Sequence, residues 1–512
     1  MGRELLLGVD IGTYSSKGVV CTPGGDVLAS ATVEHGLSLP RPGWAEQDAD
    51  AVWWGDLVEI TRRLLADGID AGDIGAVGVS AIGSCLLPVD AAGAALRPGI
   101  LYGIDTRATD EIAWLNAEYG EDALRAFGGM ALTSQAIGPK ILWLRRHEPD
   151  IYARAARMVT SSSYLVFKLT GEWVMDRHSA SHYNPLIGIQ AMEWDGRFAE
   201  PIVSLDRLPA LRWANEIAGG VSAAAANVTG LRVGTPVSVG TVDAAAEALS
   251  VGVIGPGDTM IMYGTTMFFI LVTERPLPNP RMWTTAYHFP GSFDVAGGMA
   301  TSGALTRWFR DQFGQPEMDA ERAGGPDAYE ALANLAAAVP AGCEGLICLP
   351  YFSGERTPIN DPDARGVFAG LTLSHTRGHL YRAILEGTAF GVRHNLEAIR
   401  EMGAAAKRLV AVGGGARNPT WLQIVSDVTG VEQVVPRRTI GACLGDAFLA
   451  GLAAGIILDL NTLASAWVRE TDLLVPNENL RARYDEYFGV YRALYETGKT
   501  QHHRLAELGK SA

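Results

Sequence analysis

The sequence lacks the features that mark a secreted, membrane-bound or nucleic-acid-binding protein. It has only five cysteines in 512 residues and no CxxC pair, which predicts reduced thiols in the cytoplasm. No apolar stretch reaches membrane-spanning length, and the apolar run near Met1 is too short for a signal peptide. The net charge is −15 and there is no run of Lys or Arg, so we expect neither nucleic acid nor a membrane as a partner.

The histidines also lack the arrangement of a zinc site. His178/His182 and His375/His379 are each four residues apart, but neither pair belongs to an HExxH motif or lies near a cysteine cluster. We interpret both as structural or surface pairs. What is present is an ordinary globular composition, 48% apolar and 19% charged, in a chain long enough for at least two domains.

The stretch 5–21, LLLGVDIGTYSSKGVVC, predicts a β-hairpin with chemistry in its turn. An apolar strand is followed by a polar turn and a second apolar run. Gly12 lets a ligand approach the backbone, while Thr13 and Lys17 offer a hydroxyl and a cation to phosphate oxygens. Asp10 adds a carboxylate that would suit Mg²⁺ arriving with the phosphate. Taken alone, the stretch is explained equally well as a polar hairpin tip.

The same design recurs at 258–273, DTMIMYGTTMFFILVT, where two apolar runs flank the turn Gly264-Thr265-Thr266. A hairpin near the start of each half predicts two similar domains that face each other, each offering a turn to one polyphosphate. We place the domains at 1–254 and 255–512, because Gly255-Pro256-Gly257 reads as a boundary. The helices expected near the C-terminus can pack back across the domain interface.

Asp243 is a candidate proton acceptor. The segment 237–251, VSVGTVDAAAEALSV, predicts a strand, a glycine turn and a helix that begins near Asp243. Asp at a helix N-terminus is often only a cap, and the position alone favours that interpretation. The alanines at 244–246, however, clear bulk from around the carboxylate and leave it well placed to receive a proton. As an aspartate, it would ordinarily have a pKa of about 4.

Three further stretches are candidates for ligand contacts. Residues 80–85 are small and polar near a strand end, which leaves room for a ligand, although a loosely packed turn explains them equally well. Asp105 and Arg107 stand two apart at the end of a predicted strand, which suits polyol hydroxyls and equally a plain salt bridge. The glycines at 413–415 precede Asn418 as a helix N-cap, so a base or phosphate can lie against backbone there. A dinucleotide site is the weaker interpretation, because no acidic partner follows.

Three longer segments carry structural predictions. Residues 100–107 predict an apolar strand, and residues 150–170 follow a helical pattern closed by Gly171. Residues 349–372 have no helical period and are rich in Gly, Pro, Arg and Asp. A loop of that length in a compact domain is usually functional.

Together these stretches make the chain resemble the FGGY family of carbohydrate kinases from end to end, and within it most closely the xylulokinases. The most specific match is 351–372, YFSGERTPINDPDARGVFAGLT, which continues to Glu386 in the pattern of the family's C-terminal signature. Further matches are 10–17, 42–48, 264–266 and 413–418.

The resemblance implies an α/β protein with the two-domain fold of actin-like ATPases and ribonuclease H, of the sugar kinase type, with a catalytic cleft between the domains. It implies ATP and Mg²⁺ as cofactors, Asp243 as the catalytic base and Asp10 as the carboxylate that holds Mg²⁺. The cofactor contacts that it implies are Thr13, Lys17, Gly264, Thr265, Gly303, Arg307, Gly414 and Asn418. The candidate sugar contacts are Gly83, Ser84, Asp105 and Asp243.

The sugar is less well defined than the reaction. Where xylulokinases carry Gln-Met-His-Gly at the first sugar strand, this chain has Ile82-Gly83-Ser84-Cys85. The expected reaction transfers the γ-phosphoryl group of ATP to a hydroxyl of a small sugar or polyol, with D-xylulose to D-xylulose 5-phosphate foremost. The alternative substrates are ribulose, erythrulose, gluconate and glycerol. An actin-like sugar sensor without kinase activity is the alternative of another class, and a homodimer is one option for the assembly.

Overall fold

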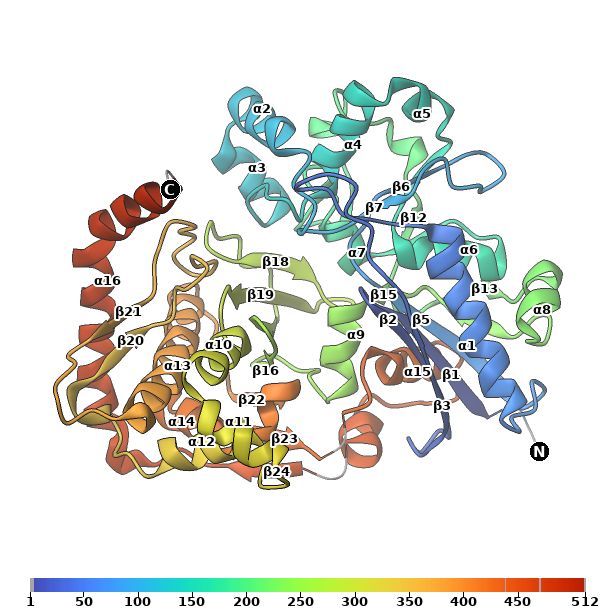
Figure 1. Ribbon diagram of the computed structural model, residues 1–512. Coiled ribbons are helices and arrows are strands. Elements are labelled where there is room, and N and C mark those ends of the chain that lie inside the picture. Colours follow the sequence, from blue (N-terminus) through green and yellow to red (C-terminus); the bar gives the residue numbers. More distant parts are fainter. Residues whose placement is uncertain (1–3, 438, 469–470, 511–512) are drawn as a thin grey trace. The chain divides into compact units, whose positions relative to one another are not determined.

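The computed structural model describes residues 4–437, 439–468 and 471–510 (Figure 1). The chain falls into two compact units. The first comprises Met1–Ile254, Val272–Asp294 and Ile440–Arg469, and the second comprises Gly255–Leu271, Val295–Thr439 and Glu470–Ala512. The predicted domains at 1–254 and 255–512 stay a prediction.

The first sheet has the strand order β13-β14-β5-β1-β2-β3, with β15 paired to β5. Because β1 pairs antiparallel with β2, the predicted hairpin at 5–21 is confirmed, and β1 also pairs parallel with β5. The strands are β1 Leu5–Ile11, β2 Ser15–Cys21, β3 Val27–Glu34, β5 Ile74–Ala81, β13 Ile217–Gly220, β14 Pro236–Ser238 and β15 Thr241–Val242.

The first unit also carries most of the helices that precede residue 254. These are α1 Gly55–Ala66, α2 Thr109–Tyr119, α3 Glu121–Gly128, α4 Ile137–His147, α5 Pro149–Arg154, α6 Ser161–Thr170, α7 Arg177–Ser181, α8 Ala223–Thr229 and α9 Asp243–Ser250. One helix from late in the sequence, α15 Ala442–Ala453, belongs to the same unit.

Alternation along β1 separates the two faces of the first sheet. Val9 lies in the core cluster that contains Leu57 of α1. Leu6 packs instead in the cluster that contains Phe448 of α15. Asp10 is an even-numbered position like Leu6, so it belongs to the face that α15 covers.

Glycines let α15 lie directly on β1 and β5. A Cβ added at Gly8 would lie 1.9 Å from a backbone oxygen of α15, and one at Gly78 would lie 2.0 Å from another. A Cβ at Gly445, within α15, would lie 2.1 Å from a backbone oxygen of α9. Since real Cβ atoms do not approach so closely, these glycines are what allow α9 and α15 to meet at the sheet.

The prediction of one helix over 150–170 is wrong. The chain forms α5, then β8 Arg157–Val159, then α6, and β8 pairs antiparallel with β6 Leu87–Val89. Met158 and Val159 are fully buried by this pairing, so a tertiary contact overrides the helical pattern. The closing Gly171 is confirmed, with φ +88° at the end of α6. The predicted strand at 100–107 is also shorter than expected, because β7 covers only Gly99–Ile100.

The second sheet has the order β18-β19-β17-β16-β22-β23-β24. Its β16 and β17 pair antiparallel, so the second predicted hairpin is confirmed, and β16 pairs parallel with β22. The strands are β16 Asp258–Tyr263, β17 Met267–Thr273, β18 Trp283–Ala286, β19 Phe293–Met299, β22 Arg408–Val412, β23 Gln433–Pro436 and β24 Thr471–Leu474.

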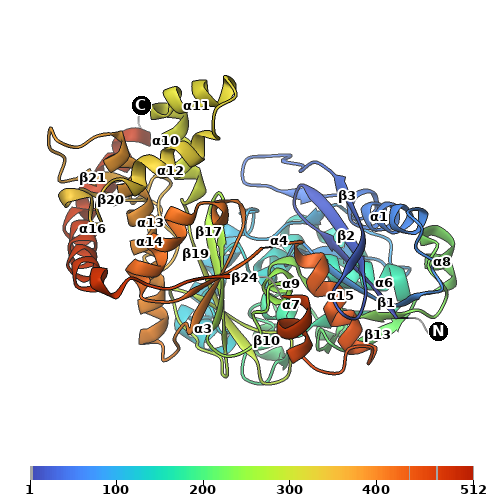
Figure 2. The ribbon, with the colours of Figure 1, turned by 90° about the horizontal axis from the view of Figure 1, so that it is seen from below.

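The second unit contains long helices and one long irregular loop (Figure 2). The helices are α10 Gly303–Phe313, α11 Gln315–Arg322, α12 Ala328–Ala337, α13 Arg377–Glu401, α14 Pro419–Thr429 and α16 Arg481–Lys510. Between β20 Ile347–Leu349 and α13 the chain forms no helix, as predicted for 349–372, and only the short β21 Val367–Ala369 pairs with β20. α16 runs beside these two strands (Figure 1). None of the helices in the described ranges combines the length and the hydropathy that a membrane span needs.

Candidate active site

A cluster of carboxylates lies where α9 and α15 approach the first sheet. Oγ of Ser80, on β5, lies 3.0 Å from Oδ1 of Asp10 and 2.7 Å from Oδ2 of Asp446. A hydroxyl has one proton to donate, so it cannot donate to both carboxylates at once. Both contacts can be full hydrogen bonds only when one of the two carboxyl groups carries a proton. We assign it to Asp446, which is fully buried and whose pKa is raised well above its usual range by burial and by Asp10.

The electrostatics of Asp10 depend on its neighbours. Its pKa is raised by burial and by the negative charges of Asp243 and Glu247, and it is lowered by the Ser80 hydrogen bond and by Lys17. Lys17 lies directly opposite Asp10 in the register of β1 and β2. The structure therefore brings together Asp10, Lys17 and Asp243, which the sequence predicted as parts of one site.

Asp243 is the first residue of α9, after Val242 as the N-cap. Its Oδ1 accepts a hydrogen bond from its neighbour's backbone, Ala244 N, at 2.8 Å. Burial, together with the charge of Glu247 one helical turn later, raises the pKa of Asp243 to about 7. The pKa of Asp243 is therefore higher than the ordinary aspartate value near 4, because the helix N-terminus is deeply enclosed, which the sequence does not show. A carboxyl with this pKa suits a general base near neutral pH.

The turn of the first hairpin is held by its carbonyl groups. Nε2 of Gln47 donates to the carbonyl oxygen of Thr13 at 2.9 Å, and Nε2 of His35 lies 3.1 Å from that of Gly12. The Thr13 hydroxyl lies 3.4 Å from the hydroxyl of Tyr102. With these carbonyls bonded to the protein and Gly12 N donating to the carbonyl oxygen of Ser15 at 3.1 Å, the turn has a fixed shape, and the Thr13 hydroxyl can donate to an anion.

The two residues predicted for sugar contact at the end of β5 have specific packing roles. Ser84 is fully buried, and its hydroxyl donates to the carbonyl oxygen of Ser179 at 3.2 Å. A Cβ at Gly83 would lie 2.9 Å from Cγ2 of Val242, the residue before Asp243. Gly83 thus gives the start of α9 its room, and sugar contact by either residue stays a prediction.

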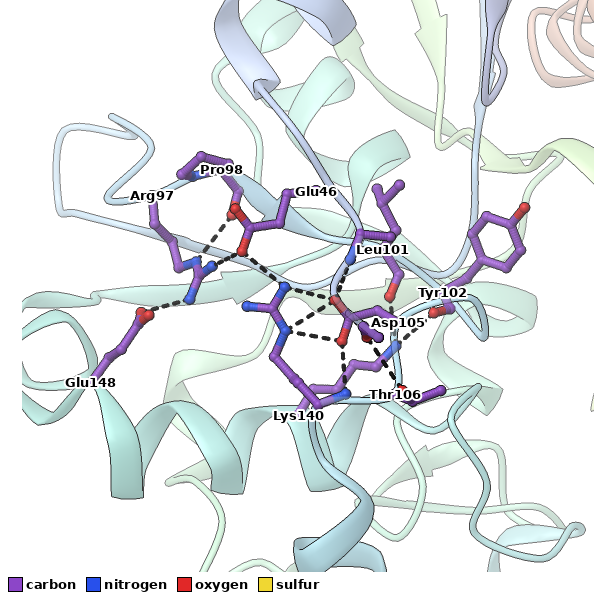
Figure 3. A network of polar contacts seen from close by, with 12 residues as sticks. Glu46, Arg97, Pro98, Leu101, Tyr102, Asp105, Thr106, Lys140 and Glu148 are labelled. Atoms are coloured by element: carbon purple, nitrogen blue, oxygen red, sulfur yellow. Dashed lines mark hydrogen bonds and ion pairs between the residues drawn. The ribbon is translucent and has the colours of Figure 1, made fainter. Parts of the chain in front are cut away.

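Asp105 lies in a buried ion-pair network (Figure 3). Its Oδ2 accepts from Ala45 N at 2.7 Å and from Arg107 Nη2 at 2.6 Å. The side chains of Asp105 and Arg107 are fully buried. Arg107 also pairs with Glu46 at 2.8 Å, and Lys140 Nζ donates to the carbonyl oxygens of Leu101 and Tyr102 at 2.5 and 2.8 Å. The salt bridge that the sequence left open is present. Asp105 therefore positions the loop after β7, and its sugar contact stays a prediction.

In the second unit, the turn of the hairpin is fastened to the start of α10. Gly303 N donates to the carbonyl oxygen of Gly264 and Ala304 N to that of Thr265, each at 2.9 Å. A Cβ at Gly303 would lie 2.5 Å from the Gly264 oxygen. This close approach brings a helix N-terminus beside the turn, an arrangement that favours phosphate. Arg307 lies one turn further along α10.

The glycine turn after β22 lies against the same hairpin. Cβ atoms at Gly413 and Gly415 would each come within 2.9 Å of Tyr263, the residue before Gly264, while one at Gly414 would meet no atom within 4 Å. Asn418 is the N-cap of α14, and its Oδ1 accepts from Trp421 N at 3.0 Å, as predicted. Gly264, Gly303 and the 413–415 turn are thus grouped by the fold.

The acidic cluster fits a hard divalent cation in one respect. Asp10 offers carboxylate oxygens, and its acidic neighbours Asp243 and Glu247 add negative charge that Lys17 partly offsets. Within residues 4–437, 439–468 and 471–510, no group of three or more His, Cys, Asp or Glu is arranged to hold a metal ion. Mg²⁺ usually takes only one or two carboxylates and completes its shell with water and phosphate oxygens, so one carboxylate is a sufficient protein contribution.

Sequence reasoning missed three members of the cluster. Glu247 could have been found, because it follows Asp243 by four residues in a predicted helix and so shares its face. Ser80 was included only as one of several small residues. Asp446 is 203 positions from Asp243 in the chain and carries no local signal beyond the flanking Gly441 and Gly445.

Comparison with known proteins identifies the family. Models of the N-terminal and C-terminal domains of the FGGY family of carbohydrate kinases match residues 5–250 and 259–454. The chain therefore belongs to the FGGY family of carbohydrate kinases, and it is a phosphotransferase with an alcohol group as acceptor.

Individual relatives are similar over nearly the whole chain. Xylulose kinase from Bacillus subtilis strain 168 is 28% identical over 99% of this chain and 100% of its own. Glycerol kinase 2 from Streptomyces avermitilis is 31% identical over 96% of each chain. The crystal structure of xylulose kinase from Rhodospirillum rubrum gives a TM-score of 0.91 at 32% identity, covering 98% of this chain and 100% of that one. The predicted α/β fold of the actin-like sugar kinase type is confirmed.

Proposed function

We propose that this kinase transfers the γ-phosphoryl group of ATP to a hydroxyl of D-xylulose, giving D-xylulose 5-phosphate. The observation that carries the proposal is the Asp243 carboxyl at the start of α9, with a pKa of about 7. The choice of sugar is supported by the xylulose kinases of Bacillus subtilis and Rhodospirillum rubrum, which match almost the entire chain.

In the proposed mechanism, the first unit prepares the sugar. Asp243 accepts a hydrogen bond from the reacting hydroxyl, orients it and takes its proton as the new P–O bond forms. Thr13 and Lys17 bind phosphate oxygens of the nucleotide, and Lys17 offsets part of their charge. Asp10 would hold Mg²⁺, which when bound neutralises charge on the transferred phosphoryl group.

The second unit, in this proposal, binds the nucleotide. Backbone N–H groups of Gly264 and Thr265 hold phosphate oxygens beside the N-terminus of α10, where Gly303 and Arg307 lie. Gly414 leaves open space for the adenosine, next to the N-cap residue Asn418. Transfer requires the bound sugar and nucleotide to be brought together with water excluded, since water would otherwise accept the phosphoryl group.

Glycerol or another polyol is the second candidate substrate. Glycerol kinase 2 of Streptomyces avermitilis is 31% identical over 96% of this chain. In addition, the first sugar strand has Ser84 where histidine was expected, and the Ser84 hydroxyl already donates to the backbone. Ribulose, erythrulose and gluconate are further candidate substrates, and the assay described next tests them as well.

The test is a coupled assay of ADP release over a panel of ketoses, sugar acids and polyols. We expect the highest kcat/KM with D-xylulose and loss of turnover in Asp243→Ala. A higher kcat/KM with glycerol or gluconate would replace the substrate. ATP hydrolysis that is independent of any sugar and survives Asp243→Ala would favour the sugar sensor instead. The cytoplasmic location and the homodimer stay predictions, the latter testable by light scattering.

A further inference from the structure

The long loop before α13 contains a segment, Glu355-Arg356-Thr357, that is hydrogen-bonded to the end of β19. Oε1 of Glu355 accepts hydrogen bonds from the backbone N of Ala300 at 2.6 Å and of Arg356 at 2.8 Å. Oγ1 of Thr357 accepts from Gly298 N at 2.8 Å. Nη2 of Arg356 donates to the carbonyl oxygen of Met299, which lies between Gly298 and Ala300, at 2.9 Å. Residues 355–357 of the loop are therefore hydrogen-bonded to residues 298–300.

Residues 298–300 are followed directly by the residues that hydrogen-bond to the hairpin turn of the second unit. Two residues after Ala300, Ser302 N donates to the carbonyl oxygen of Thr265 at 3.2 Å, and Gly303 N donates to that of Gly264 at 2.9 Å. A Cβ at Gly298 would lie 2.5 Å from the backbone oxygen of Met267, at the other end of the same turn. A displacement of residues 298–303 would therefore move the turn.

The 355–357 segment is in turn anchored to α16. Glu355 and Asp361 exchange backbone hydrogen bonds, N to O, at 2.8 and 2.9 Å. Oδ2 of Asp361 accepts from the hydroxyl of Tyr495 at 2.7 Å and lies 2.8 Å from Nε2 of His503, both on α16. A continuous series of polar contacts thus runs from the C-terminal helix to the turn at 264–266.

Glu355 is an ionisable residue in a buried position, where burial of its charge lowers stability. Its side chain is almost fully enclosed, and burial raises its pKa to about 7 although two backbone N–H groups lower it. A buried ionisable group costs stability unless its contacts compensate, and here the compensation comes from the backbone N–H groups of Ala300 and Arg356. A carboxylate that accepts from two backbone N–H groups defines where residue 300 lies.

We propose that Glu355 and Thr357 are positioning residues that hold the 264–266 turn in the geometry that binds nucleotide phosphates, and that Asp361 with α16 supports them. The inference rests on the proposed function of that turn and extends it. It assigns a role to the loop at 349–372, and it makes the phosphate-binding geometry of the second unit depend on residues that do not touch the nucleotide.

The experiment compares Glu355→Ala and Thr357→Val with two other substitutions in the same loop. Glu355→Gln keeps an oxygen that can accept both hydrogen bonds. Asp363→Asn is the matched control, since Asp363 pairs with Lys510 at the surface at 2.8 Å. We expect Glu355→Ala and Thr357→Val to raise KM for ATP and the Kd of ADP by about tenfold, with KM for the sugar unchanged. Glu355→Gln should recover most of the loss, and Asp363→Asn should match the wild type.

A second readout does not depend on catalysis. Hydrogen exchange of peptides covering 262–268 and 8–18 is compared in the ligand-free variants. We expect faster exchange at 262–268 alone in Glu355→Ala and Thr357→Val. Faster exchange in both peptides would mark general destabilisation and overturn the proposal. So would an unchanged Kd of ADP with a loss confined to kcat.

His503→Ala gives a gentler test, because this side chain is 42% exposed and its removal leaves the core intact. We expect a smaller rise in the Kd of ADP, in the same direction. Failure of the proposed function is distinguishable from failure of this inference. If no sugar is phosphorylated by the wild type, the exchange of 262–268 and the Kd of ADP still decide whether Glu355 and Thr357 position the turn.

Discussion

The two hairpins share one backbone design but have different surroundings. Around the first turn lie ionisable side chains, with Asp10 on its own strand and Asp243 and Asp446 on helices packed against the sheet. The second turn instead lies between Tyr263, the last residue of β16, and Met267, the first residue of β17. Its carbonyl groups are bonded to the backbone of the segment that starts α10.

This difference separates two kinds of chemistry. Carboxylates that raise one another's pKa can take up and hold protons, which proton transfer requires. Backbone N–H groups do not titrate near neutral pH, and they bind anions through the fixed partial charges of correctly oriented dipoles. Substitutions of the carboxylates around the first turn should therefore act on rate and pH dependence, and substitutions at the second turn should act on nucleotide binding.

The largest effect is expected at Asp243. Asp243→Ala should lower kcat for sugar phosphorylation by about 10²–10⁴-fold, the usual contribution of a general base, and leave the Kd of ADP nearly unchanged. Steady-state kinetics and calorimetry measure the two quantities. Asp110→Ala is the matched control, because Asp110 is an exposed aspartate in the first turn of α2. A kcat of Asp243→Ala close to that of the wild type would remove the assignment of the base.

Gly303→Ala tests the second region. Because the added Cβ would lie 2.5 Å from the carbonyl oxygen of Gly264, the turn must move. We expect KM for ATP to rise about tenfold while KM for the sugar stays the same. Gly489→Ala, in α16 where a Cβ would meet no atom within 4 Å, is the control. A rise in sugar KM alone would contradict the separation of roles.

The pH dependence sharpens the comparison. With a pKa of about 7, Asp243 becomes protonated as the pH falls below 7, so kcat/KM should decline there by about tenfold per unit. The negative charge of Glu247 raises this pKa, so Glu247→Gln should move the midpoint to lower pH. A pH–rate profile of both proteins measures the shift. A midpoint that rises or stays in place would show that Glu247 does not act on the base.

The smallest effect is expected at Asp446, in stability rather than rate. Its folded pKa is raised above the unfolded value near 3.8, so the unfolded state loses its proton first as the pH rises. The wild type should therefore lose stability as the pH rises above about 4, relative to Asp446→Asn, whose amide can still donate to Ser80. Urea unfolding midpoints at pH 5 and pH 8 test this. A difference between the two proteins that does not change with pH would indicate a charged Asp446.

Much of the fold could be predicted because its signals are local. Alternation of apolar residues and a small turn identified both hairpins, and Asn418 before a proline identified the start of α14. The segment at 150–170 failed because Met158 and Val159 satisfy a helical pattern and a strand equally well until β6 is beside them. In the site, the role of Glu355 was out of reach, since its partner Ala300 is 55 positions away in the chain.

The sequence by itself determined the elements and the chemical groups at their ends, because hydrogen bonding within a hairpin and side-chain periodicity involve only neighbouring residues. Only the tertiary structure decided which carboxylates meet and how strongly each holds a proton. A pKa depends on burial and on charges and hydrogen bonds within a few ångströms, and at Asp10 those come from β2, β5, α9 and α15. Glycines at 8, 78 and 445 permit that meeting, and their purpose is visible only once the helices lie on the sheet.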